Sequence, residues 1–168
     1  MPADLSNAAR WNRTAWGLAL AATLALVIAV LLPPFLAPGP RLALVRGFHV
    51  LCHQLPARSF AVDGIALAAC HRCTGIYVGL VLGVLALPLA HRLRPYLPAA
   101  SRVNTEGMIL LMAVAPAALD WGGDLLGLWT NTVTTRVATG LWFGLLAGLL
   151  FAGAVTRVPQ RRTDVATR

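Results

Sequence analysis

The sequence predicts an all-α integral membrane protein with four transmembrane helices and a short interfacial or re-entrant amphipathic helix. Three observations lead to this prediction. Hydrophobic residues make up 58% of the chain and charged residues only 12%, whereas soluble domains contain about 25% charged residues. The mean hydropathy is +0.71. Uncharged stretches long enough to cross a bilayer recur along the 168 residues, which are expected to form a single transmembrane domain over 1–168.

Four apolar stretches predict the spans, because a hydrocarbon core of about 30 Å requires roughly 17–25 helical residues. The first is too long for the apolar core of a secretory signal, about 7–15 residues, so we expect it to be retained. The third meets Asp120 and Asp124, and these carboxylates must lie at its end or face the bundle interior. The predicted spans are 15–36, 74–90, 107–127 and 137–155, with polar tails at 1–13 and 157–168.

The basic residues predict the orientation. All 14 are arginine, and the net charge is +8. Four spans place both termini on one side, where nine arginines fall against five on the other, so the positive-inside rule favours cytoplasmic termini. We therefore expect a multi-pass protein of the cell (inner) membrane, with the lipid bilayer as its surroundings. The arginines flank apolar stretches instead of forming one basic stripe, so nucleic-acid binding is not expected.

Small residues recur at every fourth position in the second and fourth predicted spans. In lipid, helices associate by close backbone packing, which small residues at this spacing allow. The rows predict either packing inside the bundle, including packing of the two rows against each other, or a face for a homo-oligomer. The rows are Gly75, Gly79 and Gly83, and Gly140, Gly144 and Gly148, which Ala152 continues.

The segment between the first two spans predicts an amphipathic helix over about 42–55. One side of this helix would be apolar and another basic, so it would lie in the membrane interface or dip into the bundle. Its apolar face would carry Val45, Phe48, Cys52 and Leu55. After it, Asp63-Gly64 predicts a turn, and the apolar run 65–69 then leads to the second span.

All three cysteines fall between residues 52 and 73, and a metal site is the first interpretation. Three thiolates and one imidazole suit a tetrahedral soft or borderline ion, such as zinc or cuprous copper. The adjacent pair Cys52-His53 seldom reaches one ion with both side chains, so His49 or His71 are alternative fourth ligands. The predicted metal ligands are Cys52, His53, Cys70 and Cys73.

Thiol–disulfide chemistry is the second interpretation. A Cys-x-x-Cys pair at a helix N-terminus has a lowered thiol pKa, to which Arg72 would add, and a thiolate is the nucleophile of disulfide exchange. An outward-facing pair in a four-helix bundle resembles the layout of quinone-linked disulfide-forming membrane enzymes, which commonly use a second cysteine pair. The redox candidates would be Cys70, Cys73 and Cys52, with a redox partner protein and a quinone as acceptor.

A structural role is the third interpretation. The cysteines would then form a stabilising disulfide or pack as small side chains, and the protein would be a non-enzymatic structural or transporter subunit. The sequence leaves open whether the protein is an enzyme. It contains no Ser-His-Asp order, no phosphate-binding glycine loop and no paired-carboxylate hydrolase pattern, so hydrolysis and nucleotide chemistry are not expected.

Further polar residues are predicted on the same side of the membrane as the cysteines. An ion pair between Asp120 and Arg136 would hold the ends of two helices together, because charges near hydrocarbon usually pair. Alternatively, Asp120, Arg136 and Arg58 would form a substrate or proton site. Tyr77 is either an interfacial anchor or a hydrogen-bond donor to this group. The whole polar cluster is predicted to contain Arg58, Arg72, Tyr77, Asp120, Asn131 and Arg136.

Several short motifs together resemble a known family. They are CHQLPARSF at 52–60, CHRCTGIYVG at 70–79, LD at 119–120, TN at 130–131, Arg136 and TG at 139–140. In this order they resemble the bacterial and archaeal membrane family called domain of unknown function 2085. Members usually have alanine where this chain has His71, which weakens any essential role for His71. The resemblance implies a small multi-span membrane protein and directs attention to Cys52, His53, Gln54, Arg58, Ser59, Cys70, Arg72, Cys73, Thr74, Gly75, Tyr77, Gly79, Asp120, Asn131, Arg136 and Gly140.

Overall fold

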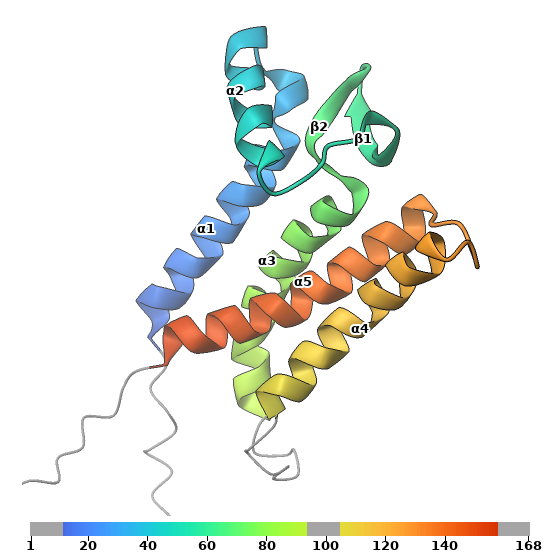
Figure 1. The fold of residues 1–168 in the computed structure, drawn as a ribbon. Coiled ribbons are helices and arrows are strands. Elements are labelled where there is room, and N and C mark those ends of the chain that lie inside the picture. Colours follow the sequence, from blue (N-terminus) through green and yellow to red (C-terminus); the bar gives the residue numbers. More distant parts are fainter. Residues whose placement is uncertain (1–11, 94–104, 158–168) are drawn as a thin grey trace, which may run out of the picture.

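The computed structural model describes residues 12–93 and 105–157. In Figure 1 four long helices form a bundle, and a shorter helix and a two-stranded hairpin lie at one end of it. The helices are α1 (Arg13–Leu31), α2 (Pro38–His49), α3 (His71–Leu93), α4 (Thr105–Leu125) and α5 (Val133–Thr156). The other elements are the strands β1 (Ser59–Val62) and β2 (Ile65–Cys70) and the 3-10 turns η2 (Pro33–Phe35) and η3 (Pro56–Arg58).

The structure contains four long apolar helices, as the sequence predicted. Helices α1, α3 and α5, and residues Gly107–Leu125 of α4, are long and apolar enough to cross a membrane. Their bounds differ from the prediction by a few residues, since α3 and α5 begin earlier than expected, at His71 and Val133. The predicted polar tails fall outside the described residues, apart from their innermost positions.

The centre of the bundle is the pair α3 and α5, whose glycine rows pack against each other. A Cβ added at Gly75 would lie 2.5 Å from the carbonyl oxygen of Val137, a distance that real Cβ atoms do not show. The other glycines of both rows also face the backbone of the opposite helix at distances that leave no space for a Cβ. The rows therefore bind the chain's own helices together, which is one of the two alternatives that their spacing predicts.

Helices α1 and α4 join this pair from outside. Helix α1 packs chiefly on α3, and α4 packs on α5. Two tryptophan side chains form hydrogen bonds between these helices. Trp16 Nε1 of α1 donates to the carbonyl of Val84 in α3 at 2.9 Å, and Trp142 Nε1 of α5 donates to the carbonyl of Met112 in α4 at 2.8 Å. Such bonds satisfy indole groups that lipid would leave unpaired. Near the chain ends, the amide of Asn12 donates to the carbonyl of Thr156 at 3.3 Å.

A hairpin of β1 and β2 precedes α3, where the sequence predicted only a turn followed by an apolar run. The strands are antiparallel, with Ser59 opposite Cys70 and Val62 opposite Ile65. Asp63 and Gly64 connect them with φ values of 50° and 78°, and positive φ at both central residues is typical of a type I′ hairpin turn. The predicted turn is thus confirmed.

Burial explains why this segment forms strands. Ala68 and Ala69 of β2 are fully buried, and β2 packs against α1, α2 and η2. A buried chain must pair its peptide groups, and the hairpin does so where an irregular loop would not. The sequence showed only a short apolar run, from which periodicity cannot distinguish a strand from an apolar connection.

Helix α2 is shorter and begins earlier than predicted. It starts at Pro38 rather than at residue 42, because proline is favoured in the first turn of a helix. It ends at His49, and the amides of Leu51 and Cys52 both donate to the carbonyl of Phe48 in the turn that follows. Cys52 is therefore a turn residue and not a member of the helix face. The interfacial position of α2 remains a prediction.

Candidate metal centre

Three elements bring the cysteines together at the end of the bundle. Cys52 comes from the turn after α2, Cys70 from the end of β2, and Cys73 from the first turn of α3. Their sulfur atoms lie within 4.8 Å of one another. Cys52 is buried, the other two are half-buried, and all three are free thiols. The cluster predicted from the sequence spacing is therefore formed in space by its three cysteines.

Hydrogen bonds hold the turn after α2 against the hairpin. The amide of Cys70 donates to the sulfur of Cys52 at 3.3 Å. Gln54 Nε2 donates to the carbonyls of Val45 and Ala68, at 2.8 and 2.7 Å, and so ties α2 to β2. Gln54 adopts a φ of 49°, a conformation that is uncommon outside glycine. The position of the Cys52 sulfur thus depends on the two hydrogen bonds that the Gln54 side chain donates to α2 and β2.

An apolar wall closes the other side of the cluster. The buried residues Val30, Phe48 and Ala68 form a core group with Cys52, and Cys70, Cys73 and Tyr77 pack against it. The rings of Phe48 and Tyr77 meet edge to face, with centroids 5.8 Å apart. Tyr77 therefore lies beside the thiols and not at a free membrane surface. A wall of this kind limits the access of water to the sulfur atoms.

Hydrogen bonding favours a thiolate at Cys70. The bond from the Cys73 thiol is the largest cause that lowers the pKa of Cys70, to about 4, and partial burial opposes it. The amides of Cys73 and Arg72 and the thiol of Cys52 add smaller contributions in the same direction. Cys70 immediately precedes α3, so its sulfur accepts from the first amides of that helix as an N-cap does. The hydrogen bonds from the other two thiols therefore favour the thiolate form at Cys70.

The predicted imidazole ligand does not join this group. No histidine or carboxylate of the described residues adds a fourth donor atom to the three sulfurs at this spacing. His53 and His49 are exposed. His71 is buried, and its ring packs against Phe60 with centroids 4.4 Å apart.

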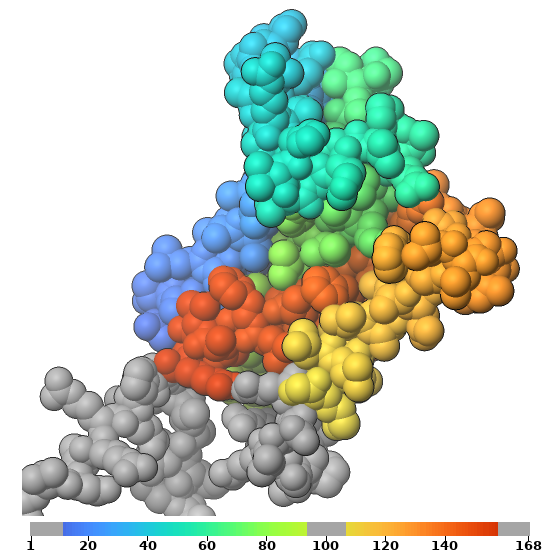
Figure 2. Space-filling view, in the orientation of Figure 1, coloured from blue at the N-terminus to red at the C-terminus, as the bar shows by residue number. Residues whose placement is uncertain are grey.

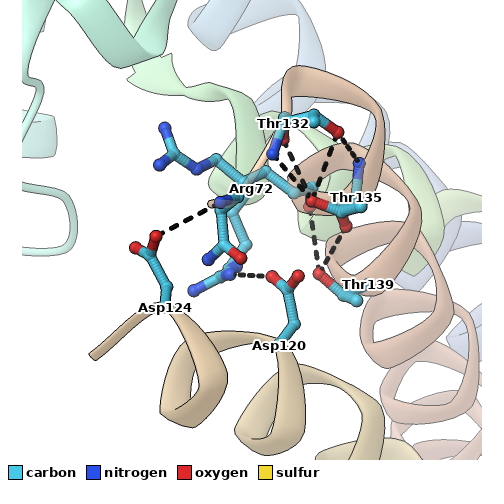
Figure 3. Close-up of polar contacts among 8 residues, drawn as sticks. Arg72, Asp120, Asp124, Thr132, Thr135 and Thr139 are labelled. Atoms are coloured by element: carbon cyan, nitrogen blue, oxygen red, sulfur yellow. Dashed lines mark hydrogen bonds and ion pairs between the residues drawn. The ribbon is translucent and has the colours of Figure 1, made fainter. Parts of the chain in front are cut away.

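A polar cluster lies nearby, between α3, α4 and the start of α5 (Figure 3). Arg72 forms an ion pair with Asp120, and the carboxylate of Asp124 accepts from the amide of Asn131 at 3.2 Å. The predicted pair of Asp120 with Arg136 is therefore wrong. The reason is that α3 begins at His71, which places Arg72 in its first turn at the level of the end of α4.

The other predicted polar residues take separate positions. Arg58 is exposed on η3, and Arg136 is half-buried in the first turn of α5. No contact in the described part of the chain joins either of them to Asp120. Thr132, which we did not single out as a site residue, caps α5 through a reciprocal pair of bonds with Thr135 (Figure 3).

Comparison with known proteins agrees with this architecture. A family model described as "Predicted membrane protein (DUF2085)" matches residues 52–150. An uncharacterised protein of Methanocaldococcus jannaschii is 32% identical over 97 residues, which cover 58% of this chain and 58% of that protein. A second uncharacterised protein, from Methanothermobacter thermautotrophicus, is 33% identical over 98 residues, which cover 58% of this chain and 81% of that protein.

No solved structure matches the chain. The family match begins at Cys52 and therefore includes all three thiols, the hairpin, α3 and α4, and most of α5. The matched region is more than half of the chain, and the apolar helices α3, α4 and α5 that it includes agree with the family description. The chain belongs to the predicted membrane protein family of domain of unknown function 2085.

Proposed function

We propose that this membrane protein binds a metal ion, zinc or copper, through Cys52, Cys70 and Cys73. The observation that supports the proposal is the convergence of three free thiols from three separate elements within 4.8 Å. The arginine distribution favours an extracytoplasmic position for this site. Thiolates are the ligands that zinc and cuprous copper prefer among protein groups.

The three cysteines would supply three ligands to an ion, and a four-coordinate ion would need one further group. Zinc is usually four-coordinate, and an open fourth position is typical of catalytic zinc sites, whereas cuprous copper accepts softer sites of fewer ligands. The lowered pKa of Cys70 favours binding, because a thiol must lose its proton to ligate a metal. Arg72 and Tyr77 would act around the site, one by its amide at Cys70 and the other in the apolar wall.

Elemental mass spectrometry of the detergent-purified protein tests the proposal. We expect about one zinc or copper per chain after purification without chelators, and loss of the metal in Cys52→Ser, Cys70→Ser and Cys73→Ser. His53→Ala is the matched control, because His53 lies next to Cys52 but outside the thiol group. Retention of metal in His53→Ala confines the site to the cysteines. Absence of metal from the unmodified protein and all variants would overturn the proposal.

A second candidate function is thiol–disulfide exchange, favoured by the thiolate at the start of α3. In this reaction the Cys70 sulfur attacks a partner disulfide, and one partner sulfur leaves as a thiolate. The Cys73 thiol then loses its proton and attacks the mixed disulfide, which yields a Cys70–Cys73 disulfide and a reduced partner. In the reverse direction, the Cys70–Cys73 disulfide oxidises two partner thiols and is itself reduced. A quinone that takes two electrons and two protons from the reduced pair would restore the disulfide and would make the protein an oxidase of partner thiols.

The redox candidate predicts a covalent intermediate. In Cys73→Ser, the mixed disulfide between Cys70 and a partner is not resolved, so it accumulates and is seen on a non-reducing gel. A metal site predicts no such adduct, and a purely structural or transporter-subunit role predicts neither adduct nor stoichiometric metal. Metal analysis and the search for a mixed disulfide together therefore distinguish a metal-binding, a redox and a structural role of the cysteine cluster.

A further inference from the structure

Two of the spanning helices contain an internal proline. Pro88 lies inside α3 and Pro116 inside α4. A proline has no backbone N–H, so the carbonyl four residues earlier loses the partner that it has in a regular helix. These carbonyls belong to Val84 and Met112. Both lie within apolar spanning helices, where hydrocarbon offers no water to replace the missing donor.

A tryptophan of a neighbouring helix supplies each missing donor. The indole of Trp16, from α1, donates to the Val84 carbonyl. The indole of Trp142, from α5, donates to the Met112 carbonyl. An indole has one donor and no acceptor, so it can replace a backbone N–H without bringing a further polar group into the bilayer. The same arrangement therefore occurs twice, between different pairs of helices.

Helix α4 is attached to the bundle on both sides of its proline. Figure 2 shows α4 at one edge of the bundle and α1 at the other, with α5 between them. Before Pro116, Met112 receives the bond from Trp142 of α5. One turn after Pro116, Asp120 forms the ion pair with Arg72 beside the thiol cluster. Prolines are usual sites of helix bending, so the two parts of α4 each need an attachment of their own.

We propose that Trp142 is a positioning residue, which caps the Met112 carbonyl, fixes the direction of α4 at Pro116 and so places Asp120 against Arg72. Asp120 lies eight residues after Met112, which is about 12 Å along the helix axis. The indole bond therefore acts on the ion pair through α4 itself. The proposal does not depend on whether the thiol cluster binds a metal.

The two parts of this arrangement can be changed separately. Trp142→Phe keeps an aromatic ring but removes the donor. Pro116→Ala restores a backbone N–H that can bond to the Met112 carbonyl within α4. Trp121→Phe is the matched control, because Trp121 also lies on α4, is exposed, and forms no hydrogen bond within the described part of the chain.

Carbonyl NMR of the full chain in detergent micelles tests the hydrogen bond directly. Met112-Ala113 is the only Met-Ala pair in the sequence, so carbonyl-¹³C methionine with ¹⁵N-alanine gives a single carbonyl–amide correlation. We expect Trp142→Phe to move the carbonyl resonance upfield, because a hydrogen bond deshields the carbonyl carbon. Trp121→Phe should leave the resonance unchanged. Adding Pro116→Ala to Trp142→Phe should largely restore it, because α4 then supplies its own donor.

Thermal unfolding of the same samples tests the positioning role. We expect Trp142→Phe to lower the Tm by about 5 °C in the unmodified background and by at most about 1 °C in Pro116→Ala. Asp120→Asn should lower the Tm less in Trp142→Phe than in the unmodified protein, because the ion pair is already displaced there. Residues that are this far apart usually contribute additively, so a smaller loss indicates that Trp142 acts on Asp120.

Three results would overturn the proposal. The first is an unchanged Met112 carbonyl resonance in Trp142→Phe. The second is an equal loss of Tm from Trp142→Phe with and without Pro116, because ring packing alone would then explain the loss. The third is additivity of Trp142→Phe and Asp120→Asn. If Trp142→Phe does not fold by itself, recovery of a folded protein on adding Pro116→Ala supports the proposal, and continued failure contradicts it.

Discussion

Arg72, in the first turn of α3, forms an ion pair with Asp120, near the end of α4. The Asp120 side chain is only 9% exposed and the Arg72 side chain 25% exposed. Helices α3 and α4 otherwise make few contacts, because both pack on α5. The amide of Arg72 also helps to hold the Cys70 thiolate, so one residue contacts both the thiol cluster and α4.

Removing one partner of this pair should destabilise the protein. Asp120→Asn leaves a partly buried guanidinium without its counter-charge, and we expect a loss of about 2 kcal/mol in the free energy of unfolding, between the values for exposed and for buried pairs. Thermal unfolding in detergent measures it. Asp124→Asn is the control, since Asp124 accepts one amide hydrogen bond and an asparagine oxygen can still accept it. A loss in Asp120→Asn no larger than that in Asp124→Asn would contradict this prediction.

The glycine rows predict a strong effect of added bulk. At Gly79 a Cβ would overlap the backbone of Leu141 and Leu145, so Gly79→Leu must push α3 away from α5. We expect a loss of about 3 kcal/mol and broadening of the monodisperse peak in size-exclusion chromatography. Gly17 of α1 has open space around it, and Gly17→Leu should leave the peak unchanged. A stable Gly79→Leu protein would contradict the close packing of these two helices.

The lowered pKa of Cys70 predicts an unusual pH dependence of alkylation in the metal-free protein. Below the ordinary pKa of about 8.5, the reaction rate of a thiol rises about tenfold for each unit by which the pH increases, because only the thiolate is nucleophilic. A pKa lowered to about 4 predicts that Cys70 is a thiolate across the neutral range, so its rate should be flat from about pH 6 to about pH 8. Peptide mapping after brief iodoacetamide treatment measures this rate for each cysteine.

The Cys73→Ser variant checks the cause of this shift. The thiol of Cys73 supplies the largest stabilisation of the Cys70 thiolate, so its replacement should raise the pKa of Cys70 and restore part of the normal rise with pH. A steep rise in the unmodified protein would instead show that Cys70 carries its proton at neutral pH.

The type I′ turn predicts that the hairpin depends on Gly64. Its φ of 78° is unfavourable for a β-branched residue, and Gly64→Val should cost about 1–3 kcal/mol. Because Cys70 ends β2, the same substitution should also weaken the metal binding that we propose for the thiol cluster. Hydrogen exchange of residues 59–70 reports the loss of the hairpin. Asp63→Asn is the control, since asparagine tolerates a positive φ, and equal exchange in both variants would contradict this view of the turn.

Much of the fold could be predicted because its signals are local. An uncharged stretch of sufficient length identifies a span without reference to the rest of the chain, and the glycine spacing identified the faces of α3 and α5. The three cysteines were identified by their type and spacing, and the structure brings their sulfurs together. Residue type and spacing alone were sufficient for these features.

The features that were missed depend on contacts between distant segments. The sequence places both Arg72 and Arg136 on the same side of the membrane as Asp120. The pairing with Arg72 follows from the first residue of α3, which the sequence pattern placed three positions too late. The hairpin forms because β2 is buried by η2, α1 and α2, and none of these contacts is visible in its own short apolar run. The absence of His53 from the thiol cluster likewise depends on the end of α2 at His49.

The pairing of α3 with α5 also has a consequence for biosynthesis. Helix α3 ends at Leu93 and its partner at Thr156, so 63 residues, from 94 to 156, are still to be translated when α3 is complete. At about 5–20 residues per second, the glycine face of α3 spends about 3–13 s in the membrane without the surface that covers it. During that interval we expect it to associate with the insertion machinery or with other nascent helices, and a ribosome stalled before Val133 would prolong this exposure.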